Sequence, residues 1–179
     1  MSKPDTSRFT CSACGEEHDL DQLSFGADVP GTWHLLTDEE RRQSELSSDQ
    51  CLIVARGKTS LYLRGCLNVP IRGTTEVFTW GVWCSLSEQS FRTISQYWDD
   101  PRRTELPPVF GWLCTAIPTY PDTMYLKTTV SQREVGLRPL VQLEPTAHPL
   151  AVHQREGIEA KELKRIVMDV LHPKRDERA

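Results

Sequence analysis

The chain has 179 residues, with 21 Lys and Arg against 25 Asp and Glu, which gives a formal net charge of −4. This length suits one domain with its own core, since domains commonly have about 100–200 residues. No apolar run approaches the ~18 residues that span a bilayer. The acidic balance argues against a nucleic-acid-binding surface, and the first residues lack the apolar segment of a signal peptide. We therefore expect a cytoplasmic protein that is not bound to a membrane.

Elements in the N-terminal third follow from local signals. Residues 1–8 are polar and are expected to form a mobile N-terminus, residues 9–172 a single globular domain, and residues 173–179 a charged tail. The pair Thr37 and Glu40 has the spacing of a capping box, in which each residue hydrogen-bonds the backbone of the other. This pair predicts a short helix that ends near Leu46.

Residues 51–71 have the pattern of a β-hairpin. If residues 57–60 form its turn, Arg56 lies opposite Leu61, and counting back along both strands places Cys51 opposite Cys66. The face that contains the two cysteines then differs from the face that contains the leucines. A slip of one residue in this register would move a cysteine to the other face.

The rest of the chain predicts more sheet and two helices. Residues 76–86 alternate like a strand, Ser87 is a suitable N-cap for a helix to about Trp98, and residues 109–117, 124–130 and 137–143 resemble strands. Apolar residues at helical spacing over residues 160–171 predict a final amphipathic helix. The expected fold class is α+β: an antiparallel sheet with a few peripheral helices and an N-terminal segment like a zinc knuckle.

Cys11 and Cys14, followed by Gly15, have the spacing of a zinc knuckle. Two thiolates on a tight turn can bind one ion, and the glycine allows backbone N–H groups to approach the sulfurs. The same spacing occurs in redox motifs, but those place the first cysteine at the start of a helix after a strand. That context is missing here, so the metal-binding interpretation is favoured.

A tetrahedral zinc needs two further ligands. The hairpin register favours Cys51 and Cys66, with His18 as an alternative fourth ligand; the competing interpretation is that Cys51 and Cys66 are reduced thiols of the core. Cys84 and Cys114 lie among apolar residues and are expected to pack there. A site closed by four thiolates is structural, whereas three protein ligands and a water would indicate catalysis.

Several segments, in order from about Phe9 to Leu171, resemble a bacterial family, domain of unknown function 2199. They are FTCSACGEEH, LSFGADVP, LSSDQC, RGCLNVPI, WGVWCSLSEQSF, YPDTMYLK and RPLVQLEPTAHPLAVHQREGI. The resemblance implies cysteines at the positions of Cys11, Cys14, Cys51 and Cys66 and does not require Cys84 or Cys114. The family typically has an acidic residue where this chain has His153. The resemblance implies no substrate.

A loop containing Glu144 and His148 is the second candidate site, because a carboxylate and an imidazole can act as general acid and base. No nucleophile stands at a recognisable spacing from them. The sequence therefore favours a binding or interaction domain with a structural zinc, whose partner is an unknown protein or small molecule. The alternative is a metal- or His-dependent hydrolase that uses the Glu144/His148 loop.

Overall fold

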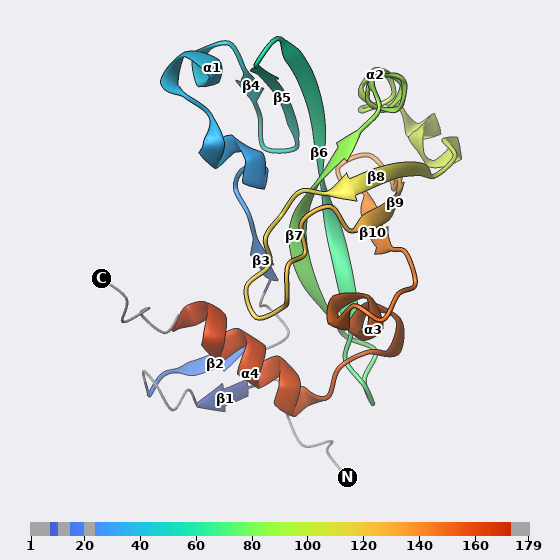
Figure 1. Cartoon of the computed structure of the whole chain (residues 1–179). Helices are drawn as coiled ribbons and strands as arrows, with labels where there is room; N and C mark the ends of the chain where they lie inside the picture. The colour runs from blue at the N-terminus through green and yellow to red at the C-terminus, as the bar shows by residue number, and fades with distance from the viewer. Residues whose placement is uncertain (1–7, 11–14, 20–23, 173–179) are drawn as a thin grey trace.

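The computed structural model describes residues 8–10, 15–19 and 24–172, and its centre is a closed barrel (Figure 1). Each barrel strand pairs antiparallel with the next one, and the last strand returns to pair parallel with the first. Five strands that alternate in direction leave the first and last pointing the same way, so the closing pair is parallel. The strands are β6 (Lys58–Pro70), β7 (Val77–Leu86), β8 (Val109–Leu113), β9 (Lys127–Ser131) and β10 (Leu140–Leu143).

The α+β class is confirmed, but the expected sheet closes into a barrel. Three further strands extend it: β5 (Gln50–Ala55) and β4 (Glu45–Leu46) continue outward from β6, and β3 (Ser24–Gly26) pairs parallel with β7. A separate two-stranded sheet contains β1 (Arg8–Thr10) and β2 (Glu17–Asp19). The predicted zinc-knuckle residues and both predicted terminal segments, apart from Arg8, fall outside the described residues.

The closing seam of the barrel depends on a close approach between β10 and β6. Leu140 pairs with Cys66, and the Cys66 N–H donates a 2.8 Å hydrogen bond to the Pro139 carbonyl. A Cβ atom at Gly65 would lie 2.6 Å from Val141 Cγ2 and 3.0 Å from the Pro139 carbonyl oxygen. Only glycine fits at this position without moving one of the two strands.

A salt bridge connects the segment just before β10, at the seam, to the segment just before β5, in the outer hairpin. Arg138 Nε lies 2.6 Å from Asp49 Oδ1, and the Asp49 carbonyl accepts a 2.8 Å hydrogen bond from the Arg64 N–H. Burial alone would raise the pKa of Asp49, but hydrogen bonds from Arg138 and Ser48 hold that pKa below its ordinary value. The carboxylate therefore stays ionised between β5 and β10.

The predicted hairpin is present, but its predicted register is wrong. Ala55 pairs with Lys58, so the turn has only two central residues, Arg56 and Gly57, with φ of 50° and 71°. Positive φ at both positions is the geometry of a type I′ turn, which suits the twist of a hairpin. Cys51 therefore lies opposite Tyr62 instead of Cys66. The shift is four residues, an even number, so both cysteines keep the predicted face.

The helices frame the barrel. The capping box of Thr37 and Glu40 is confirmed, although its helix ends at Arg42 instead of near Leu46, and Ser87 caps the next helix as predicted. Among the described residues, none of the helices has the length and apolar character needed to cross a lipid bilayer. The helical elements are η1 (Gly31–Leu35), α1 (Asp38–Arg42), α2 (Glu88–Gln96), η2 (Pro101–Glu105), α3 (Pro149–Glu156) and α4 (Ala160–Leu171).

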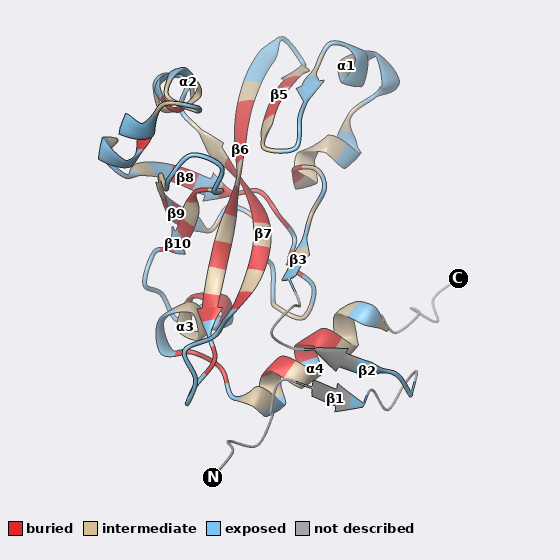
Figure 2. Cartoon of the chain, turned by 180° about the vertical axis from the view of Figure 1, so that it is seen from behind, coloured by how far each residue is buried: buried red, intermediate tan, exposed pale blue. Residues whose placement is uncertain are grey.

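The core fills the barrel and continues under α3 and α4. Buried residues alternate along the second half of β6 and the first half of β7, and the C-terminal helices at the lower end of the view contain further buried residues (Figure 2). Inward residues from facing strands, including Leu67, Val82 and Val141, are almost fully buried. Leu150 of α3 and Leu163 of α4 join the same cluster. A second, smaller cluster lies outside the barrel, beneath the β5–β6 hairpin, and consists of Cys51, Ile53, Tyr62, Trp83 and Cys114.

Replacing Gly65 with alanine should destabilise the protein by about 1–3 kcal/mol, because the new methyl group overpacks the seam. Chemical denaturation of the full chain measures this change. Val141→Ala serves as the matched partner, since it removes the nearer clashing atom. The double variant should lose less stability than the sum of the two single changes. Strict additivity would contradict the packing described at the seam.

Arg138→Gln should lower the free energy of unfolding by about 1 kcal/mol or less, because the pair with Asp49 is partly exposed. The pKa of Asp49 is depressed in the folded state, so this contribution is complete above the ordinary value of 3.8 and is lost as the pH falls through the folded-state pKa. Denaturation of both proteins between neutral and acid pH checks the effect. The exposed Arg41→Gln is the control, and its difference from the native protein should stay near zero.

Candidate functional site

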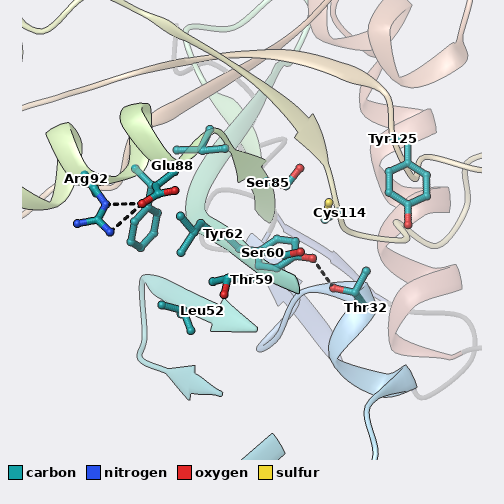
Figure 3. Close-up of a pocket in the computed structure, with 13 residues that line it drawn as sticks. Thr32, Leu52, Thr59, Ser60, Tyr62, Ser85, Glu88, Arg92, Cys114 and Tyr125 are labelled. Atoms are coloured by element: carbon teal, nitrogen blue, oxygen red, sulfur yellow. Dashed lines mark hydrogen bonds and ion pairs between the residues drawn. The ribbon is translucent and has the colours of Figure 1, made fainter. Parts of the chain in front are cut away.

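A cavity of about 920 Å³ opens between the β5–β6 hairpin, the start of α2 and the segment that follows β8 (Figure 3). We call it the hairpin cavity. This volume is within the range of about 300–1,000 Å³ typical of ligand sites. Its lining consists of Thr32, Leu52, Thr59, Ser60, Leu61, Tyr62, Ser85, Leu86, Glu88, Phe91, Arg92, Cys114 and Tyr125.

The cavity exists because β6 is longer than the strands beside it. Leu61 pairs with Leu86, where β7 ends, and the part of β6 before Leu61 pairs only with β5. Ser87 then caps α2, which leaves the barrel at this point. The overhanging hairpin, α2 and Thr32 of η1 all contribute residues to the lining of this space.

Hydroxyl groups supply much of the polar lining. The Thr32 hydroxyl donates a 3.0 Å hydrogen bond to the hydroxyl oxygen of Tyr62, which is 5% exposed (Figure 3). Burial raises the pKa of Tyr62, although hydrogen bonds with Thr32 and Ser60 partly oppose that shift. The phenol is therefore neutral and can both donate and accept.

The two thiols nearest this cavity are protonated. Cys114 lines the cavity, and its Sγ donates a 3.4 Å hydrogen bond to the Trp112 carbonyl. Burial raises the pKa of Cys114 and raises that of Cys51 to about 12. Because the thiolate is the reactive form, neither sulfur is prepared for nucleophilic attack.

Charges at the cavity occur as one pair on α2. Arg92 Nη2 lies 2.7 Å from Glu88 Oε1, and both side chains are largely exposed. They lie one helical turn apart and compensate each other at the side of the cavity away from Tyr125 (Figure 3). The lining therefore combines neutral hydroxyls, apolar carbons and one compensated ion pair.

The side chains of the Glu144/His148 loop, the alternative candidate site, make contacts with the backbone and with Lys127. His148 is the N-cap of α3: its Nδ1 accepts a 3.2 Å hydrogen bond from the Leu150 N–H, and its Nε2 lies 3.2 Å from the Asp122 carbonyl oxygen. Glu144 forms a 3.4 Å salt bridge with Lys127. Glu144 borders a second cavity of about 450 Å³, whose described lining does not include His148.

The described cysteines are distributed over separate places in the fold. Cys84 and Cys114 are buried, and Cys66 lies partly exposed at the seam. Cys51 pairs with Tyr62, so it is four positions, roughly 13 Å along the strand, from the level of Cys66. Thiolates on one zinc lie about 4 Å apart, given Zn–S bonds of about 2.3 Å. The observed register therefore no longer supports Cys51 and Cys66 as ligands of the same zinc ion.

The four-cysteine zinc site stays a prediction. Cys11 and Cys14 lie outside the described residues, and for His18 only the backbone pairing with Phe9 is described. Within the described part of the chain, no group of three or more His, Cys, Asp or Glu side chains could hold a metal ion.

Sequence reasoning missed the cavity residues and one partly buried polar pair. The hydroxyl of Tyr120 lies 2.9 Å from Nδ1 of His153, under the edge of Trp80. Burial raises the pKa of Tyr120 to about 12 and lowers that of His153. The sequence carried no local signal for this pair, because Tyr120 and His153 are 33 residues apart.

The chain belongs to the DUF2199 family, described as an uncharacterised protein conserved in bacteria, which matches residues 10–158. This match includes the barrel and the hairpin cavity. The helix α4 and its N-cap, Glu159, lie beyond its end. No curated protein matches the chain. No solved structure matches it either.

If the predicted zinc site exists, the purified full chain should contain one zinc ion, and Cys11→Ser or Cys66→Ser should remove it and lower the melting temperature, since metal binding is linked to folding. Elemental analysis and thermal unfolding measure both effects. Cys114→Ala is the control, because that thiol packs beside the cavity. A full chain that contains no zinc and whose Cys11 and Cys14 thiols react readily under native conditions would disprove the site.

Proposed function

We propose that the protein is a binding protein whose site is the hairpin cavity and whose ligand is an uncharged molecule with several hydroxyl or carbonyl groups. The observation that supports this most directly is the lining itself: a cavity of about 920 Å³ with hydroxyls from η1, β6 and β7. A hydroxyl can donate or accept, so such a lining suits a ligand rich in the same groups.

Apolar side chains form much of the rest of the cavity lining. Leu52, Leu61, Leu86 and Phe91 contribute carbon surface, so the ligand has apolar faces as well as polar edges. A charged ligand fits less well, because Glu88 and Arg92 already compensate each other. An uncharged ligand with alternating apolar and hydroxyl-bearing surfaces matches both features.

The hydrolase alternative has weaker support. Both ring nitrogens of His148 are within hydrogen-bonding distance of backbone groups, and Glu144 is paired with Lys127. The thiol at the hairpin cavity, Cys114, has a raised pKa. These arrangements favour binding over general acid–base or nucleophilic catalysis.

Thermal unfolding of the full chain in the presence of hexoses, disaccharides, inositols and nucleosides tests this proposal. At least one of these uncharged classes should raise the melting temperature in a concentration-dependent way, because a ligand that binds only the folded state stabilises it. The phosphate esters of the same compounds form the charged comparison set and should stabilise less. Stabilisation by the phosphate esters alone would contradict an uncharged ligand.

For the compound that binds, Thr32→Val and Tyr62→Phe should each raise Kd roughly tenfold, since each removes a hydroxyl from the hydrogen-bonded pair in the cavity. Titration calorimetry well below the melting temperature gives the Kd. Thr104→Val, at an exposed threonine of η2 that is not part of the cavity lining, is the matched control and should leave Kd unchanged. Equal effects of all three variants would place the ligand elsewhere.

A further inference from the structure

Outward-facing side chains continue from the hairpin cavity across the barrel. Tyr62 pairs with Ser85, Ser85 with Trp112, and Trp112 with Lys127, so four neighbouring strands contribute one row. Side chains at paired positions of neighbouring strands point to the same face of a sheet. Tyr62 and Ser85 line the cavity, and Trp112 and Lys127 extend the row beyond it.

A second row lies beside the first one on the same face. Phe110 pairs with Thr129, and Thr129 pairs with Gln142. The alternating residues Gly111, Leu113, Thr128 and Val141 are buried and point inward. We call the exposed part of the two rows, together with Glu144, whose N–H donates to the Lys127 carbonyl, the outer-strand surface; it consists of Phe110, Trp112, Lys127, Thr129, Gln142 and Glu144.

Two aromatic rings on this surface are exposed to a degree unusual for their size. Phe110 is 53% exposed and Trp112 is 40% exposed. Their ring centroids are 5.1 Å apart and their planes meet at 87°, an edge-to-face contact that orients both rings. Adjacent exposed aromatic residues on a regular strand form a rigid apolar contact surface.

The polar neighbours of these rings are neutral or compensated. Lys127 and Glu144 form a salt bridge, and Thr129 and Gln142 add a hydroxyl and an amide. The second cavity of about 450 Å³ begins at Phe110 and includes all four of these residues. This composition does not favour a phosphate backbone, which requires uncompensated cationic side chains.

We propose that the outer-strand surface and the hairpin cavity together bind a linear, uncharged oligosaccharide. The inference rests on the function proposed above and names its ligand class. One end of the chain occupies the cavity, and the following sugar units lie along Trp112 and Phe110. A pyranose ring has a C–H face that packs on an aromatic ring and a rim of hydroxyls that pair with hydroxyl, amide and carboxylate groups.

The dimensions agree with this arrangement. From β7, where Ser85 lies, to β10, where Gln142 lies, the path crosses three strand spacings, or about 14 Å. That distance corresponds to a short oligosaccharide rather than to a single sugar. Tyr125, which is 60% exposed and lines the cavity with Cys114, donates its backbone N–H to the carbonyl of Leu113, the residue after Trp112.

Titration calorimetry of the full chain with cello-, malto-, xylo- and chito-oligosaccharides, each as the disaccharide and the hexasaccharide, tests the inference. In at least one series the hexasaccharide should bind more tightly than the disaccharide. Trp112→Ala and Phe110→Ala should each weaken hexasaccharide binding roughly fivefold, since each removes one aromatic contact. Disaccharide binding in the cavity should remain as in the native protein.

Val77→Ala is the matched control, because Val77 is 46% exposed at the opposite end of β7 and its replacement removes apolar surface of the same kind. It should leave both Kd values unchanged. If the disaccharide and hexasaccharide bind equally while Thr32→Val still weakens them, the outer-strand surface is excluded and the cavity proposal stands. If only nucleosides or inositols bind, the oligosaccharide inference fails and the proposed function is retained.

A third measurement separates sugar binding from protein contact. Analytical ultracentrifugation over a range of concentrations should give the same oligomeric state for the native chain and for Trp112→Ala. If Trp112→Ala abolishes self-association and leaves saccharide binding intact, the exposed rings form a protein interface and the inference is overturned.

Discussion

The parallel contact between β10 and β6 is the constraint on which the rest of the structure depends. Cys66 donates to the Pro139 carbonyl at 2.8 Å, and Gly65 allows the two strands to approach this closely. Without the contact, β6 and β10 would expose unpaired edges, which are prone to aggregation. Closure instead surrounds Leu67, Val82 and Val141 with apolar neighbours and brings β10 within reach of the hairpin through Arg138 and Asp49.

Closure also explains where the candidate site lies. The seam binds β6 near its middle, at Cys66, and β7 pairs with β6 only as far as Leu61. The first residues of β6 therefore extend past the barrel together with β5. Barrel interiors of this size are filled by side chains, so ligand-sized spaces lie outside the barrel, and the larger of the two described above lies under the overhanging hairpin.

Burial sets the chemistry of that space. It raises the pKa values of Tyr62, Cys51 and Cys114, so that the phenol and both thiols remain protonated. An ionised carboxylate, Asp49, is kept at the seam, where Arg138 pairs with it. The Asp49–Arg138 pair at the seam is thus separate from the hydroxyl groups of the hairpin cavity, on which the proposed binding of hydroxyl-rich ligands rests.

Local patterns in the sequence predicted the elements that depend on neighbouring residues. The Thr37–Glu40 capping box, the Ser87 cap, the alternation of β7 and the amphipathic α4 all follow from contacts within a few positions, and the structure contains each of them. Membership of the family was also readable from the sequence. The buried positions of Cys84 and Cys114 followed from their apolar surroundings.

The tertiary structure alone decided the closure of the sheet, the register of the hairpin and the location of the candidate site. A two-residue type I′ turn and a four-residue turn leave the same alternation of faces, so the pattern could not distinguish Tyr62 from Cys66 as the partner of Cys51. The cavity joins Thr32, Tyr62 and Cys114, which are far apart in the chain and individually ordinary. Local sequence determines which face a side chain occupies, whereas long-range packing determines which faces meet.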